Sequence, residues 1–119
     1  MQTHSSKLKE WRTTVGWYAQ RELKGRKFAA GVRATMVFMF ERPKSHYRIG
    51  KFSHLLKDSA PDDHTQYPDI DKLERAILDA LTGVAYSDDA QVCAVGKSKR
   101  WVPRGHLPGL EITLRGVCT

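Results

Sequence analysis

The sequence predicts an α/β fold in which two helices pack on one face of a small mixed β-sheet. Three observations support this class. The length of 119 residues suits one modest core, and apolar residues make up an ordinary 40% of the chain. The predicted order of elements is helix, strand, long loop, helix, strand, strand, which implies two packed layers. We therefore treat residues 1–119 as a single domain.

The first helix and the first strand have clear periodicities. Apolar side chains recur at helical spacing over residues 6–23, and Gly25 is a suitable C-terminal stop. This stripe consists of Leu8, Trp11, Val15, Tyr18, Ala19 and Leu23. Residues 32–40 alternate with period two and are rich in aromatic and β-branched side chains. They predict a strand that is largely buried on both faces and ends before Pro43.

A second helix is predicted to start at Pro68 and Asp69 and to stop at Gly83. Its apolar stripe consists of Leu73, Ala76, Ile77, Ala80 and Leu81. Two strands are expected to follow, at residues 91–97 and 110–116, the first of them buried. We expect them to form a hairpin with a basic tip. The cations of this tip are Lys97, Lys99, Arg100 and Arg104.

The distribution of charge indicates a polyanionic partner. The net charge is +7, so nucleic acid is the first candidate and an anionic membrane surface the second. Five cations with no acidic residue fall within residues 42–57, namely Arg42, Lys44, Arg48, Lys51 and Lys57. This long loop is predicted to follow phosphates, although a merely solvated loop is the alternative. No apolar run is long enough for a membrane span or a signal peptide, so we expect a cytoplasmic protein.

Four aspartates are candidates for chemistry. Asp69 and Asp71 lie at the start of the second helix, and Asp88 and Asp89 precede the strand predicted at residues 91–97. Gathered carboxylates repel one another unless a hard cation such as Mg²⁺ or Mn²⁺ neutralises them. The alternative is that these residues only cap the helix, favour its dipole and form a turn. The spacing leaves both interpretations open.

Histidine and cysteine do not suggest a soft-metal site. The five histidines lack a ligand spacing, and we expect His46 and His64 to be exposed to solvent. Cys93 and Cys118 are interpreted as free thiols.

The acidic stretch resembles the signature of the RusA family of Holliday-junction resolvases. The matching segments are Pro68-Asp69-Ile70-Asp71-Lys72-Leu73-Glu74-Arg75, Asp79-Ala80-Leu81 and Asp88-Asp89-Ala90-Gln91-Val92. Residues 43–47 also resemble a loop of phage-type members. The resemblance implies a homodimeric, Mg²⁺-dependent endodeoxyribonuclease in which Mn²⁺ can substitute. Such an enzyme resolves four-way junctions in DNA recombination and repair. We expect a bacterial host cytoplasm, with a phage or prophage origin, and no organic cofactor.

The resemblance also assigns roles to individual residues. Asp69, Asp71 and Asp89 are the implied metal ligands, and Asp88 is either a fourth ligand or a residue that orients the others. Arg75 would stabilise charge on the scissile phosphate. The predicted DNA contacts are Lys44, His46, Arg48, Lys51, Lys72, Lys97 and Lys99.

Three features depart from the family pattern. The chain opens directly on a helix where members have a preceding strand, which suggests a short variant or a truncated chain and bears on dimerisation. Lys72 stands where many members have Asn, and Arg75 where many have Lys. Two other functions stay open: a nuclease for flaps, forks or other branched DNA, and a non-catalytic basic DNA-binding protein.

Overall fold

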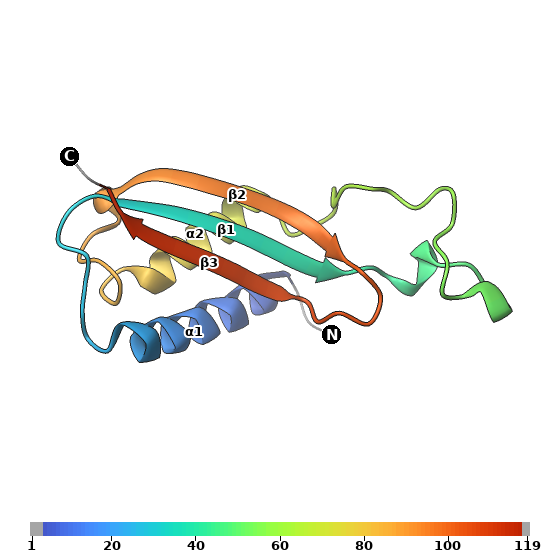
Figure 1. Cartoon of the computed structure of the whole chain (residues 1–119), viewed down its shortest axis with the longest axis horizontal. Helices are drawn as coiled ribbons and strands as arrows, with labels where there is room; N and C mark the ends of the chain where they lie inside the picture. Colours follow the sequence, from blue (N-terminus) through green and yellow to red (C-terminus); the bar gives the residue numbers. More distant parts are fainter. Residues whose placement is uncertain (1–3, 118–119) are drawn as a thin grey trace.

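Two helices cover one face of a three-stranded sheet in the computed structural model of the chain (Figure 1). The structure describes the backbone of residues 4–117 and the side chains of residues 10–117. The elements are α1 (His4–Leu23), β1 (Val32–Glu41), α2 (Ile70–Leu81), β2 (Val92–Val102) and β3 (Gly109–Gly116). The predicted α/β class with a mixed sheet and two helices is confirmed. The predictions for the side chain of Leu8 and for Cys118 lie outside the described residues.

The sheet has β1 at its centre. Strand β2 pairs with β1 in parallel, and β3 pairs with the other edge of β1 in the antiparallel sense. The predicted hairpin is therefore wrong, because β1 separates β2 from β3 and the connection at residues 103–108 crosses the end of β1 (Figure 1). A parallel pair needs a long crossover, which residues 42–91 supply through α2.

The core lies between β1 and the helices. The side chains that β1 turns inward are Val32, Ala34, Met36 and Phe38, each with 0% exposure. They pack against the buried stripe of α2, which includes Leu73, Ile77 and Leu81, and the Trp11 ring of α1 stacks 5.7 Å from the Phe38 ring. The helices thus cover one face of the sheet only.

The opposite face of β1 is not buried, so the prediction of burial on both faces is wrong. Arg33 and Thr35 are exposed, and Val37 and Met39 are half-buried. Strand β2 lies at an edge of the sheet, so its first residues are half-buried at most and Cys93 is an exposed free thiol. Within residues 4–117, no helix is long and apolar enough to cross a bilayer.

Residues 42–66 form a projecting segment, which we call the arm. The molecule measures 54 × 32 × 22 Å, and the arm forms one end of its long axis (Figure 1). Two short 3-10 turns, Lys44–His46 and Gly50–Phe52, give the arm its shape, and an antiparallel bridge joins Tyr47 to Leu56. The segment predicted as an irregular loop is therefore ordered by local hydrogen bonds.

Candidate active site and nucleic-acid surface

Two of the predicted ligand carboxylates lie at the start of α2. Asp69 occupies the N-cap position, yet its side chain makes no capping hydrogen bond. Its Oδ2 lies 3.9 Å from the Nζ of Lys72. Asp71 follows in the first turn of the helix, and both aspartates are exposed. These carboxylates therefore face solvent, where a cation or a phosphate-bearing substrate can reach them.

Two lysines of β2 hold this region in place. The Nζ of Lys99 donates to the carbonyls of Gln66 at 2.7 Å and Pro68 at 3.1 Å. The Nζ of Lys97 forms an ion pair with the carboxylate of Glu74 on α2. Both ammonium groups are thus engaged within the protein. These contacts connect β2 to α2 and to the segment before it, and the predicted DNA contact of the two lysines stays a prediction.

Arg75 lies one helical turn after Asp71, so the two residues share a side of α2. The Arg75 side chain is exposed and has no hydrogen-bond or ion-pair partner among the described residues. A planar guanidinium in this position can bind two phosphate oxygens at once. Its predicted role as an electrostatic stabiliser is thus compatible with its surroundings.

Asp88 and Gln91 form a capping box immediately before β2. The Oδ1 of Asp88 accepts the backbone N–H of Ala90 at 2.8 Å. The Oε1 of Gln91 accepts the N–H groups of Ser87 and Asp88 at 2.9 and 3.2 Å. The Nε2 of Gln91 donates to two carbonyls of residues 28–30, both at 2.9 Å. Asp88 therefore has a structural partner, and Gln91, which the sequence singled out only as part of a motif, fastens β2 to the start of β1.

Asp89 lies at the opposite end of α2 from the other two predicted ligands. Tyr86, three residues before Asp89, fixes the position of this segment. It is fully buried, and its hydroxyl donates to the carbonyl of Leu78 in the last turn of α2 at 2.9 Å. Burial raises the pKa of Tyr86, and the carboxylates of Asp89 and Asp79 raise it further. The N–H of Gly83, just after α2, also donates to the Tyr86 carbonyl at 2.7 Å, so the segment that leads to Asp89 starts beside the C-terminal end of the helix. Because an α-helix rises 1.5 Å per residue, Asp79 lies about 12 Å along the axis from Asp71.

The sheet register leads to the same separation. Val32 pairs with Val92 beside the capping box, whereas Phe38 pairs with Lys99, which binds the Pro68 carbonyl. Six residues of strand correspond to about 20 Å. Among the described residues, no three His, Cys, Asp or Glu side chains are arranged so that they could hold one metal ion. Within the described chain, the start of α2 and the segment before β2 are thus far apart.

An aromatic cluster anchors the arm to the body. The rings of His46 and His64 lie 5.1 and 4.3 Å from the Trp101 ring of β2, and Phe40 lies 4.3 Å from His64. The Arg42 guanidinium lies over Trp101 and donates to a backbone carbonyl of the arm at 2.7 Å. His46 and His64 are only 8% and 7% exposed. The prediction that they are exposed is wrong, and His46 has a packing role in place of the predicted DNA contact.

His64 is held uncharged in this cluster. Burial lowers the pKa of the His64 imidazole, and the positive charge of Lys99 lowers it further. The Nδ1 atom of His64 is buried without a hydrogen-bond partner among the described residues. At neutral pH the ring is therefore uncharged and contributes packing instead of phosphate binding.

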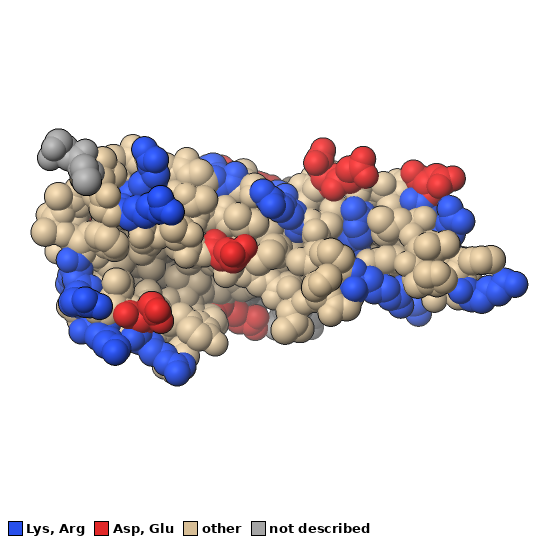
Figure 2. Space-filling view, viewed as in Figure 1, with Lys and Arg blue, Asp and Glu red and all other residues tan. Residues whose placement is uncertain are grey.

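Figure 2 shows Lys and Arg side chains along one side of the arm and acidic side chains on the other. Five cations and three aspartates give residues 42–66 a net positive charge. Lys44, Arg48 and Lys51 are exposed, which agrees with their predicted position on a phosphate-binding surface. Arg48 also lies 3.4 Å from Asp58, but both side chains remain largely in solvent and such exposed pairs are weak. These cations therefore remain accessible to a polyanion.

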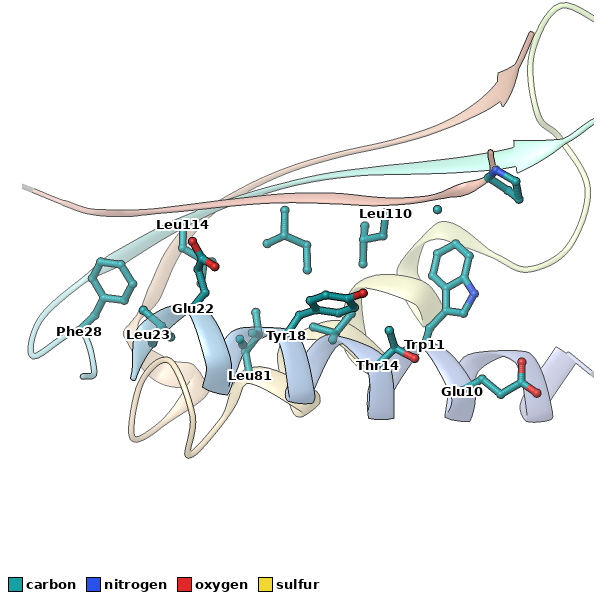
Figure 3. A pocket seen from close by; sticks show the side chains of 15 residues that line it. Glu10, Trp11, Thr14, Tyr18, Glu22, Leu23, Phe28, Leu81, Leu110 and Leu114 are labelled. Carbon is teal, nitrogen blue, oxygen red and sulfur yellow. The ribbon is translucent and has the colours of Figure 1, made fainter. Parts of the chain in front are cut away.

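A separate apolar groove of about 840 Å³ lies between α1 and β3 (Figure 3). Its floor includes Trp11 and Val15 from α1 and Leu110, Ile112 and Leu114 from β3, and none of the predicted site residues lines it. Leu110, Ile112 and Leu114 of β3 are only half-buried, which leaves this groove open. The groove leaves part of the sheet without an internal partner.

Exposed carboxylates at a helix start and a projecting arm of net positive charge are typical of the class of proteins that bind nucleic acid at their surface. The particular family follows from the whole sequence. A family model described as "Endodeoxyribonuclease RusA" matches residues 2–115 of the 119-residue chain, so the chain belongs to the RusA family of junction-resolving endodeoxyribonucleases. Among curated proteins, no sequence matches this chain.

Proposed function

We propose that two copies of this chain form a Mg²⁺-dependent nuclease that cuts four-way DNA junctions by paired nicks. The observation that supports the proposal is the separation along the sheet between the start of α2, which carries Asp69 and Asp71, and the segment before β2, which carries Asp89. Each chain then offers two half-sites. A full set of Asp69, Asp71 and Asp89 forms where the start of α2 in one copy meets the segment before β2 of the other. This arrangement makes the homodimer a condition of catalysis.

The donor set fits Mg²⁺, with Mn²⁺ as a substitute. Asp69, Asp71 and Asp89 are exposed carboxylates, and hard oxygen ligands are those that these ions prefer. Asp69 and Asp71 would hold the ion from one copy and Asp89 from the other. A bound ion would supply an activated water and neutralise charge on the phosphate. Asp88 falls outside this set, because its oxygen already accepts the N–H of Ala90.

The remaining residues of the site bind and orient the DNA. Arg75 would contact the scissile phosphate, where charge increases in the transition state. Lys72 at the acidic start of α2, and Lys44, Arg48 and Lys51 on the arm, would contact neighbouring phosphates without reading the base sequence. A two-fold axis would present one composite site to each of two opposing strands. Two symmetric nicks then resolve the junction.

The decisive experiment mixes two inactive variants, Asp71→Asn and Asp89→Asn. In a heterodimer with shared sites, one site carries both substitutions and the other combines intact Asp71 with intact Asp89. Random exchange makes about half of the dimers mixed, each with one of two sites intact, so nicking should recover to about a quarter of the wild-type rate. Sites built within single chains would give no recovery.

A matched mixture controls for unspecific effects of subunit exchange. Asp69→Asn and Asp71→Asn both alter the start of α2, so their heterodimers contain a defect in each site under either arrangement and should stay inactive. Mg²⁺ and Mn²⁺ should support wild-type cleavage and Ca²⁺ should not, because Ca²⁺ prefers a larger and looser coordination shell. Full activity in EDTA would contradict the metal requirement. A protein that binds junctions but never cuts them, in any mixture or metal, would be a non-catalytic DNA-binding protein.

A further inference from the structure

The tip of the arm exposes apolar side chains that the fold does not use. Ile49 is 88% exposed and Phe52 is 48% exposed, and Leu55 and Leu56 are each 40% exposed. Single exposed apolar residues are common on protein surfaces, but a group of them at the end of a projection usually marks a contact surface. We call residues 48–56 the arm tip.

The arm tip is braced, so its apolar residues are held outward. The N–H of Arg48 donates to the carbonyl of Leu55 at 2.8 Å, and the N–H of Leu55 donates to Phe52 at 2.9 Å. Gly50 adopts φ +73°, a conformation that closes the turn and that other residues rarely accept. Arg104 from the connection between β2 and β3 donates to the Ser53 carbonyl. Ile49 therefore projects from a fixed turn.

The charges around the tip favour DNA over another protein as the partner. The Lys51 ammonium lies 5.3 Å from the centre of the Phe52 ring, and the Arg104 guanidinium lies 4.9 Å from that of Tyr47. Lysine is depleted in protein interfaces, whereas cations beside apolar side chains are typical of proteins that bind phosphates and insert a side chain between bases. The arm tip contains Arg48 and Lys51 and no acidic residue, and the three aspartates of the arm, Asp58, Asp62 and Asp63, follow it in sequence.

We infer that Ile49 and Phe52 enter the centre of a branched DNA molecule and contact base faces at the branch point. The inference rests on the proposed function and adds a source of structural selectivity to it. Insertion into a linear duplex must separate stacked base pairs, at a cost of a few kcal/mol per step. At a branch point a base pair already lacks a stacking neighbour on one side, so insertion costs less. Lys44, Arg48 and Lys51 would bind the phosphates of either DNA, and the tip would distinguish between the two.

The test compares binding of a four-way junction and of a linear duplex with the same arm sequences, in EDTA so that no cutting occurs. The variant Ile49→Ala/Phe52→Ala should bind the junction about 10-fold more weakly and the duplex unchanged, because contact with one base face is worth about that factor. A 2-aminopurine base at the branch point should become brighter with wild-type protein and not with the variant. Ile49→Ser should lose this signal, and Ile49→Phe should retain it.

The matched control is Leu107→Ala, because Leu107 is 87% exposed and lies outside the arm. It should keep both the junction preference and the 2-aminopurine signal. Equal loss in the control, or an unchanged preference in the tip variant, would overturn the inference. So would a tip variant that sediments as a monomer while keeping its junction preference, since the tip would then be a protein contact. Wild-type protein without any junction preference would instead contradict the proposed function.

Discussion

Asp88 and Asp89 are adjacent in sequence, yet we expect substitutions at the two positions to have opposite effects. Asp88→Ala removes the oxygen that accepts the Ala90 N–H at 2.8 Å and so opens the capping box. Loss of such a cap costs about 1 kcal/mol. For a domain of this size, about 1 kcal/mol lowers the unfolding midpoint by about 4 °C. Asp88→Asn keeps an acceptor oxygen and should unfold close to the wild-type temperature.

Cleavage should depend on Asp89 and not on Asp88. Asp88→Asn removes a charge but keeps the cap, so it should nick a labelled four-way junction at nearly the wild-type rate. Asp89→Asn should unfold like wild type, because its exposed carboxylate makes no hydrogen bond with the part of the chain that the structure describes. It should lose cleavage if Asp89 is a ligand of the proposed composite site. Loss of the Asp88 side chain would thus change the stability of the fold, and loss of the Asp89 charge would change the cleavage rate.

Thermal unfolding followed by circular dichroism gives the first quantity, and single-turnover nicking well below the unfolding midpoint gives the second. Asp88→Asn that unfolds normally but does not cut would place Asp88 among the metal ligands and refute the structural role. Asp89→Asn that cuts normally would remove Asp89 from the site. The Asp71→Asn variant, altered at the other end of α2, is the inactive reference.

Three further predictions follow from the described contacts. The pKa of His64 is lowered from 6.5 in the folded chain, so as the pH falls the unfolded chain takes up a proton before the folded chain does. The free energy of unfolding should therefore be constant above about pH 6.5 and decrease below it. His64→Phe should reduce this decrease in the free energy of unfolding, measured by urea unfolding at a series of pH values. A decrease as large as in wild type would show that His64 does not cause it. Gln91→Leu removes four side-chain hydrogen bonds and should lower the free energy of unfolding by about 2–4 kcal/mol, whereas a loss below about 1 kcal/mol would show that Gln91 does not fasten β2. Neutralising Lys44, Arg48 and Lys51 together should reduce the slope of log affinity against log salt by about 0.9 per lost phosphate contact, and an equal slope would place the DNA surface elsewhere.

Helix α2 and the core face of β1 could be predicted because their periodicity reflects burial directly. The apolar stripe of α2 faces the core in the structure. The places of β2 and β3 in the sheet could not be predicted. Alternation of apolar and polar residues shows which face of a strand is buried, but not which strand pairs with it. The apolar residues Val37 and Met39 also suggested burial on both faces, although only one face of β1 is covered by helices.

The candidate site residues could be named from the sequence, but their arrangement could not. The spacing of the aspartates along the chain does not tell whether the two groups meet within one chain, because that depends on the direction of β2 relative to α2. Burial of His46 and His64 was missed because their partner Trp101 lies 37 or more residues away and comes close only when β2 extends to Val102. The partners of Lys97 and Lys99, Glu74 and the Pro68 carbonyl, lie 23 and 31 residues away, so the local pattern around the two lysines did not indicate these contacts.

The direction of α2 has a consequence for how cutting is controlled. Since α2 runs opposite to β2, the acidic start of the helix and the segment before β2 lie at different ends of the body (Figure 1). Under the shared arrangement, a lone chain bound to DNA by its arm has no complete ligand set and cannot nick. Under that arrangement each copy would complete the site of its partner, so a nick would require that two chains and two arms are already in place. The dependence of catalysis on assembly then favours cuts in pairs, as resolution of a four-way junction requires.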